Sequence, residues 1–436
     1  MNIMFLCMGR MLDVYYDSSL EISNKSDINS TYYISDRKHF TKFVTKQHNF
    51  ESTNTYLSEW SITDKVMNYF NPEELSRIEK TYFKDNSIWE PLVADRRVFM
   101  GNLCKYTQDY KPVYGYEEMM SLLIESVQSI ENFLDLHKPN IIIGFTVATF
   151  GEYLIALIAK ERGIKFVQLR HTKIKNYYTF SSDLHEEYEQ IRASFSSKDN
   201  IDNHKKFIDG YIEDIKKKGM VYEGTIGYSG SLAKALIQYP KYFIFSLIND
   251  IRYFRIPKDN HYRASLTKIF FYDKIFRFLR NSYQQKILKK HYLQEKNLTE
   301  MNYVFFPLHA EPEIAISIFS MHYQNQIEVI RNISLSLPAN FKLIVKEHPR
   351  NIGRRKITYY KKILQIPNVN LVEPGLNPSY IIANSKLVIV LSGFLAFEAL
   401  MAKIPVISLG SAMYNMLPKT LINHVCLLYT SDAADE

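Results

Sequence analysis

Beyond residue 302, short apolar runs alternate with amphipathic stretches at regular spacing. The apolar runs predict strands, and the amphipathic stretches predict helices. The expected strands are 303–306, 342–346, 368–372, 387–391 and 406–409, and the expected helices are 325–337, 358–364, 378–384 and 394–402. Strands that alternate with helices in this way form a parallel sheet covered on both faces. The pattern therefore predicts a Rossmann-like domain.

The N-terminal part carries the same kind of pattern less completely. The apolar start of the chain, 1–8, predicts a buried strand, and 115–136 predicts a long helix. A strand at 141–145, a helix through 153–158 and a strand at 165–169 then form a crossover unit of the doubly wound kind. The stretch 17–111 has weak periodicity, and we assign it only loosely to this first domain.

These patterns divide the 436 residues into four parts. We expect an N-terminal Rossmann-like domain at 1–190, a basic, aromatic helical connector at 191–300, and a C-terminal Rossmann-like domain at 301–425. The last eleven residues, 426–436, resemble the translation of a sequencing adapter. We therefore expect the natural protein to continue past Val425 and the C-terminal domain to be incomplete here.

The composition indicates an ordinary globular protein, with 46% hydrophobic and 23% charged residues. The three cysteines have no paired spacing, so neither a disulfide framework nor a zinc site is indicated. The apolar start is too short for a signal peptide, and no run is long enough to span a membrane. We expect a cytoplasmic protein, in contact at most with the inner face of the cell membrane.

The segment 228–299 is the basic part of the chain, with fourteen Lys or Arg residues against four Asp or Glu residues. Aromatic residues are interleaved with these charges. Two interpretations stay open: a helix pair with a solvated basic face, or an amphipathic surface that contacts anionic lipid or a polyanionic glycan. Nucleic acid is disfavoured as a partner, because no recognised DNA- or RNA-binding module accompanies the charge.

Ligands of open parallel sheets bind beyond the carboxyl ends of the strands, so the residues after each predicted strand are the ones to examine. After 303–306 come Glu311 and Glu313, on either side of Pro312. Either carboxylate is a candidate general base or a reader of the nucleotide's base. An acidic residue that starts a helix explains Glu313 equally well.

The next strand ends in a basic loop with Lys346, His348, Pro349 and Arg350. The proline stiffens the loop, and the imidazole of His348 is placed to donate to a phosphate oxygen or to protonate a leaving group. Three cationic or donor groups at one strand end fit an anion better than they fit a solvated loop.

The loop after 387–391 contains Ser392 and Gly393, and Glu398 lies in the helix that follows. Small residues at a helix start let a phosphate approach free backbone N–H groups. Glu398 is a candidate acceptor for ribose hydroxyls. As alternatives, Gly393 serves only tight packing and Glu398 is only a surface residue. The sequence has no Asp-x-Asp pair, so we expect no metal and no cofactor.

The motifs Phe306-Pro307-Leu308-His309, Val345 to Pro349, and Gly393 with Glu398-Ala399-Leu400, in this order and spacing, resemble the capsule polysaccharide biosynthesis family, which includes Kdo transferases. The resemblance covers about Tyr303 to Leu417. It implies two Rossmann-like domains in the GT-B arrangement and a transferase that uses a nucleotide sugar, with Kdo or another CMP-linked sugar as donor and a glycan or glycolipid as acceptor.

Carried over by position, the resemblance implies that His348 and Ser392 contact the donor phosphate and that Glu398 holds the ribose. The chain departs from the family at Phe394, where a Thr usually follows the glycine. This departure leaves the donor type open. For the acceptor's general base, Glu152, His171 and Glu311 are candidates, and we expect the acceptor beside the loop after Phe145.

Three other functions stay open. A CDP-glycerol or CDP-ribitol phosphotransferase of teichoic-acid type also pairs a histidine with a phosphate loop, but its Asp-Tyr-Ser-Ser loop is absent from this sequence. A sugar-nucleotide epimerase would need more acidic catalytic residues. A glycan-binding or export accessory protein would keep the fold without turnover.

Overall fold

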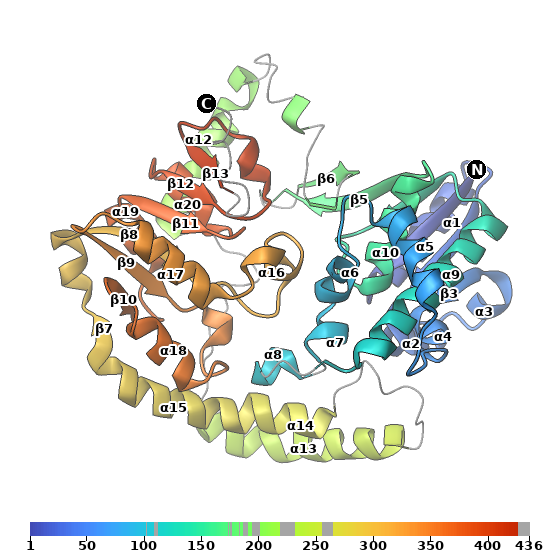
Figure 1. Cartoon of the computed structure of the whole chain (residues 1–436), viewed down its shortest axis with the longest axis horizontal. Coiled ribbons are helices and arrows are strands. Elements are labelled where there is room, and N and C mark those ends of the chain that lie inside the picture. The colour runs from blue at the N-terminus through green and yellow to red at the C-terminus, as the bar shows by residue number, and fades with distance from the viewer. Residues whose placement is uncertain are drawn as a thin grey trace. The chain divides into compact units, whose positions relative to one another are not determined.

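The structure is a computed structural model that describes residues 1–101, 103–108, 112–172, 174, 177–182, 184–185, 191–193, 201–218, 232–254 and 265–425. The chain divides into two compact units (Figure 1). The first contains 1–102, 110–190 and 258–263, and the second contains 103–109, 191–257 and 264–436. The predicted adapter-derived tail lies outside the described residues.

Within its described residues, the N-terminal unit holds a six-stranded sheet in the order β3-β2-β1-β4-β5-β6. Strand β6 runs antiparallel to β5, and the other neighbouring strands are parallel. The strands are β1 (Asn2–Cys7), β2 (Asn29–Ile34), β3 (Thr55–Ser58), β4 (Ile141–Gly144), β5 (Lys165–His171) and β6 (Tyr178–Ser181).

The helices of this unit connect the parallel strands and cover the sheet (Figure 1). They are α1 (Met11–Ser23), α2 (Arg37–Val44), α3 (Phe50–Thr53), α4 (Glu59–Thr63), α5 (Pro72–Tyr82), α6 (Trp89–Ala94), α7 (Arg96–Phe99), α9 (Tyr116–His137) and α10 (Phe150–Glu161). On one face of the sheet, Phe5 and Tyr32 stack 5.8 Å apart between ring centroids, in an aromatic core with Phe50.

The C-terminal unit holds, within its described residues, an all-parallel sheet in the order β13-β12-β11-β8-β9-β10-β7. Its strands are β7 (Tyr292–Leu293), β8 (Asn302–Pro307), β9 (Phe341–Lys346), β10 (Val369–Val372), β11 (Leu387–Val390), β12 (Val406–Ser408) and β13 (Ile422–His424). The connecting helices are α16 (Ile314–Ser317), α17 (Gln326–Ser336), α18 (Ile357–Leu364), α19 (Pro378–Asn384) and α20 (Leu395–Met401).

Alternation along the central strand β8 produces two cores. Val304 and Phe306 are buried on the face covered by α17 and α18. Tyr303 and Phe305 are buried on the face covered by α19 and α20. Because a strand directs successive side chains to opposite faces, a strand that is apolar throughout must be covered on both faces.

Long helices precede this sheet in the chain: α12 (Ile201–Lys218), α13 (Leu232–Phe254), α14 (Leu266–Phe270) and α15 (Arg277–Leu288). The π-helical turn Phe271–Phe276 joins α14 to α15 without a break. Helix α13 runs antiparallel to α14, with the Phe243 ring centroid 5.6 Å from that of Phe270, while Asp250 accepts hydrogen bonds from the backbone N–H groups of Leu266 and Thr267, each at 2.9 Å. Together, α13, α14 and α15 form what we call the helical hairpin.

The predicted fold class is confirmed: two Rossmann-like α/β units, with helical segments between the two sheets in the order of the sequence. The nine elements expected between 303 and 409 are all present, with every bound shifted by one residue or less. The structure adds β2 and β3 in the stretch where periodicity is weak, and it adds β7 and β13 at the edges of the C-terminal sheet. The predicted domain boundaries stay predictions. The helices of the expected connector group with the C-terminal unit.

No helix among the described residues is long and apolar enough to cross a bilayer.

Gly151 on α10 tests the packing of the N-terminal unit. A methyl group at this position would lie 1.6 Å from the hydroxyl oxygen of the buried Tyr33. We expect Gly151→Ala to destabilise the protein by about 1–3 kcal/mol, because the ring must leave its site.

The matched control is Gly210→Ala on α12, where nothing lies within 4 Å. We expect this change to stabilise the protein by about 0.5–1 kcal/mol. Thermal unfolding of the full chain measures both, and equal melting temperatures for the two variants would contradict the packing.

Candidate functional site

The carboxyl ends of three strands meet at one edge of the C-terminal sheet. Strand β8 lies between β11 and β9, and all three run parallel. From β8 the chain proceeds to β9 and β10 on one side, and from β11 it proceeds to β12 and β13 on the other. The boundary between β8 and β11 is therefore the topological switch point, where ligands of open α/β sheets bind.

A histidine and a glycine meet at this switch point. Gly393 follows β11, and a methyl group on it would lie 2.8 Å from Nε2 of His309, which follows β8. The backbone of His309 is fixed by Gln326, whose side chain accepts from the His309 N–H at 2.7 Å and donates to the His309 carbonyl at 3.2 Å. The imidazole is thus held beside the one residue type that leaves room for it.

His348, after β9, is held as a neutral imidazole. Its Nδ1 accepts a hydrogen bond from the backbone N–H of Arg350 at 3.2 Å, which assigns the ring proton to Nε2. Burial, followed by the electrostatic influence of His309, Arg350 and Lys346, lowers the pKa of His348 to about 3. The ring therefore offers a neutral Nε2–H donor at physiological pH.

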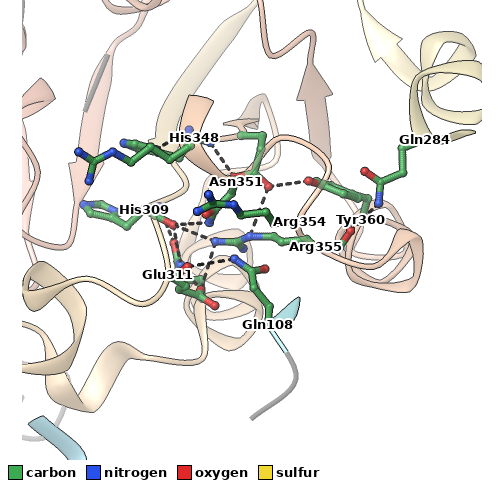
Figure 2. Close-up of polar contacts among 12 residues, drawn as sticks. Gln108, Gln284, His309, Glu311, His348, Asn351, Arg354, Arg355 and Tyr360 are labelled. Atoms are coloured by element: carbon green, nitrogen blue, oxygen red, sulfur yellow. Dashed lines mark hydrogen bonds and ion pairs between the residues drawn. The ribbon is translucent and has the colours of Figure 1, made fainter. Parts of the chain in front are cut away.

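The loops after β8 and β9 are joined by a fully buried guanidinium, that of Arg355. Its Nη2 donates to the His309 carbonyl at 2.8 Å and lies 3.2 Å from Oε1 of Glu311. Its Nε lies 3.3 Å from Oε2 of Glu347, which also accepts from the Tyr360 hydroxyl at 2.7 Å. Figure 2 shows Arg355 between Glu311 and Tyr360.

Helix α15 clamps the loop that carries His348. Arg277 donates to the carbonyls of Arg350 and Ile352, at 3.0 and 2.8 Å. Arg280 and Gln284 donate to the carbonyls of Arg354 and Arg355, each at 2.5 Å. Gly353 packs so closely that a methyl group on it would lie 2.6 Å from a backbone oxygen of α15, at a φ of +75°. Part of the basic charge predicted for the connector thus serves this internal contact.

A short helix from the N-terminal part of the sequence also reaches the site. It is α8 (Cys104–Thr107), which belongs to the C-terminal unit. Gln108 follows it and donates to the Glu311 carbonyl at 3.1 Å (Figure 2). The guanidinium of Arg354 lies 5.8 Å from the Tyr106 ring centroid. Residues more than 200 positions apart therefore support one loop.

The predicted carboxylates Glu311 and Glu313 are both ion-paired. Glu311 contacts Gln326 and Arg355, and its side chain is 11% exposed. Glu313 pairs with Arg350, with 2.5 Å between Oε1 and Nη1. These contacts favour bracing roles, and the catalytic roles stay predictions.

The side chains of two predicted donor-binding residues, Lys346 and Ser392, donate to backbone carbonyls. The Lys346 ammonium donates to the Pro374 carbonyl at 2.9 Å, and burial lowers its pKa to about 8. Pro349 begins the short turn Pro349–Asn351 after His348. The Ser392 hydroxyl donates to the Ala315 carbonyl at 2.8 Å. Its side chain is therefore engaged with α16.

Glu398 is buried near the start of α20, where its Oε1 accepts from the hydroxyl of Ser379 at 2.8 Å. Ser379 lies in the first turn of α19. Both helices begin at the carboxyl edge of the sheet, so Glu398 lies on the same rim as Gly393.

The acceptor-base candidates of the N-terminal unit lie at the carboxyl ends of its strands. Glu152 is buried, accepts from the Ala148 N–H at 3.2 Å, and has its pKa raised to about 7 mainly by burial. His171 ends β5 and meets the Tyr178 ring edge-on, with 5.2 Å between centroids. The catalytic roles of Glu152 and His171 stay predictions.

Sequence reasoning did not select three buried residues of the site, His309, Gln326 and Arg355. His309 stood inside a motif directly after a predicted strand, so its position was a usable signal. Arg355 lies nine residues beyond β9, and Gln326 begins a helix. No local pattern marks either as a partner of the loop after β8.

Residues 232–424 match the profile of the family described as capsule polysaccharide biosynthesis protein. The resemblance seen in the sequence is confirmed over this segment. The match begins in α13, so the family region includes the helical hairpin as well as the C-terminal sheet.

Among curated proteins, none matches the chain. Among solved structures, the KpsC beta Kdo 2,7 transferase of Thermosulfurimonas dismutans is 13% identical, over 68% of this chain and 74% of that chain, with a TM-score of 0.30. The beta Kdo 2,4 transferase of the same KpsC is 10% identical, over 66% and 74%, with a TM-score of 0.30. UDP-GlcNAc 2-epimerase of Methanocaldococcus jannaschii is 13% identical, over 94% and 84%, with a TM-score of 0.23. Likenesses this weak do not bear on activity.

Replacing Arg355 tests whether the buried guanidinium holds the site together. We expect Arg355→Met to destabilise the protein by about 3–5 kcal/mol, because Glu347 would stay buried without its cation. The matched control is Arg331→Met, which removes a guanidinium that is 60% exposed and paired with Glu328. Its expected cost is about 0–1 kcal/mol. Urea unfolding of the full chain compares them, and a control as damaging as Arg355→Met would refute the assignment.

Proposed function

We propose that this chain is a glycosyltransferase of capsule or surface polysaccharide biosynthesis, and that it binds the phosphate of a nucleotide-sugar donor between β8 and β11. The observation that carries the proposal is the meeting of His309, His348 and Gly393 at the switch point of a parallel sheet. The family of the segment 232–424 supports the biosynthetic context.

In this proposal, His348 donates its Nε2–H to a donor phosphate oxygen. A neutral donor already fixed by its Nδ1 contact loses little freedom on binding. Gly393 has no side chain, so the phosphate can approach the backbone there. A side chain at this position would also collide with His309. Arg350 lies at the opening of the same loop with its side chain 37% exposed, where it attracts the anion.

The transfer breaks the bond between the anomeric carbon and the phosphate oxygen. The electron pair leaves with the nucleotide phosphate, where hydrogen bonds stabilise the charge that develops. An acceptor hydroxyl forms the new bond and gives its proton to a base, for which Glu152, His171 and Glu311 stay the candidates. Glu398 is proposed to accept from the ribose hydroxyls. The reaction is proposed to need no metal, because protein donors occupy the phosphate's surroundings.

The donor is proposed to be a CMP-linked sugar such as Kdo, and the acceptor a glycan or glycolipid at the cytoplasmic face of the membrane. The phosphotransferase, the epimerase and the accessory protein remain the competing functions. Release of free nucleotide from one member of a panel of CMP-, UDP- and GDP-sugars, with transfer of the sugar to an acceptor, would support the transferase. Transfer of an alditol phosphate, or binding without turnover, would contradict it.

The role of His348 has a direct test. We expect His348→Ala to weaken nucleotide-sugar binding about tenfold or more, because a hydrogen bond to a charged group is lost. His348→Gln should stay within about threefold of the wild type, because its amide supplies a neutral N–H donor. Titration calorimetry with the panel member that binds best measures both, and exposed His322→Ala is the control. If the Gln variant loses as much affinity as the Ala variant, the neutral-donor role is wrong.

The role of Gly393 is tested by a single methyl group. Gly393→Ala would place a carbon 2.8 Å from Nε2 of His309. We expect nucleotide-sugar affinity to fall about tenfold or more, since the imidazole and the backbone approach are both disturbed. Gly375→Ala, in the loop after β10 with nothing within 4 Å, is the matched control and should bind normally. Unchanged affinity in Gly393→Ala would remove this residue from the donor site.

A further inference from the structure

Helix α13 of the helical hairpin has an apolar outer face. Its inner face is defined by Phe243, which packs on α14, by the buried Ser246 and by Asp250. Outside these contacts, large side chains are exposed to solvent: Ile244 by 55%, Phe245 by 61%, Leu247 by 42%, Ile248 by 45% and Ile251 by 54%. The solvent face of a helix in a globular protein is normally polar.

Helix α15 also exposes apolar side chains. Phe276, Leu279 and Tyr283 are spaced three and four residues apart, so they form one stripe, and they are 46%, 55% and 57% exposed. Toward the C-terminal end, Lys286 and Lys290 extend the same stripe at three- and four-residue spacing. The opposite side of α15 holds Arg277 and Gln284, which are engaged with the loop after β9.

The surface charges of the hairpin helices are mostly positive. The sequence of α13, α14 and α15 with its π-helical turn contains two carboxylates, Asp250 and Asp273. Asp250 caps α14 by accepting from Ser265, Leu266 and Thr267. Asp273 pairs with Lys274 at 3.2 Å and with Arg277 and Arg354 at 3.3 Å. Both acids are therefore engaged inside the unit.

The lysines, by contrast, lie on the surface. Those exposed on the described helices and at their end are Lys241, Lys268, Lys274, Lys286, Lys289 and Lys290. An apolar stripe flanked by lysines, in helices whose acids face inward, is complementary to a surface that is both anionic and apolar beneath. A second copy of the chain fits poorly, because two such faces would bring like charges together.

We propose that the outer face of the helical hairpin docks on an anionic phospholipid surface, with the α13 face and the Phe276–Tyr283 stripe in the interfacial layer and the lysines at the headgroups. The helices lie on the bilayer, since none in the described chain can cross it. This inference deepens the proposed function by naming the surface that contacts a membrane. Vesicle binding and nucleotide binding are separate measurements, so either can fail alone.

The test is co-sedimentation of the full chain with vesicles of phosphatidylcholine, with and without about one third phosphatidylglycerol. We expect binding to the anionic vesicles, weakened by high salt, and little binding to the neutral ones. Phe245→Ser with Ile248→Ser should reduce partitioning at least tenfold. Lys286→Glu with Lys290→Glu should reduce it about fivefold or more for each lysine.

Matched controls carry the same changes elsewhere on the C-terminal unit. Leu335→Ser removes an apolar side chain that is 77% exposed on α17, and Lys361→Glu with Lys362→Glu reverses two exposed charges on α18. These should bind vesicles like the wild type. Melting temperature and nucleotide-sugar affinity, unchanged in every variant, establish that the fold and donor site are intact.

Three outcomes would overturn the inference: no binding to anionic vesicles, binding that the hairpin variants leave unchanged, or loss of binding in the controls as well. Sedimentation velocity tests the alternative that a second copy of the chain covers this face. Concentration-dependent self-association that the Phe245→Ser, Ile248→Ser variant abolishes, without vesicle binding, would assign this face to a second copy of the chain.

Discussion

The geometry of the candidate site depends on one buried interaction, the contact of the Arg355 guanidinium with Glu347 and Glu311. Removing charges from water is costly, and it is sustained only where each charge meets partners. Burial raises the pKa of the Glu347 carboxyl above its ordinary value, although Arg355 opposes the shift. Because these groups come from the loops after two different strands, their pairing fixes the distance between the loops that hold His309 and His348.

Helix α15 connects this interaction to the rest of the C-terminal unit. It satisfies four carbonyl groups of the loop after β9, which has no regular strand or helix partner for them. Unpaired carbonyls would otherwise favour a loop that moves toward water. The same helix bears the exposed apolar stripe on its other side. If the hairpin docks on lipid, the loop of His348 is therefore held about one helix diameter, roughly 10–12 Å, from the surface.

The local sequence pattern was sufficient to predict the strands and helices that follow a simple hydrophobic periodicity. Strand β8 and helix α18 could be predicted because a fully buried strand is apolar throughout and a surface helix is apolar on one side. Strands β2 and β3 could not, since their tyrosines and threonines alternate weakly with polar neighbours. Their strand state comes from pairing with β1, which no local window contains.

For the site, the sequence indicated the three loops but not how their side chains are engaged. Loops at strand ends follow from topology, so His348 and Gly393 could be predicted to share an edge. The partners of Glu311 could not, because Gln108 and Arg355 approach it from positions 203 and 44 residues away. Long-range polar contacts leave no periodicity, and the same residue types serve equally well on a surface.

The electrostatics of the site explain why a neutral histidine is suited to it. A protonated His348 would be buried and would face the positive charges of Arg350 and Lys346, and its low pKa expresses first the burial and then that repulsion. An anion bound beside the ring would offset those charges and raise the pKa again. By linkage, a ligand that raises the pKa of His348 itself binds more tightly when the ring is protonated. A phosphate and a proton would therefore bind this loop cooperatively, whereas a neutral ligand would gain nothing from the surrounding cations.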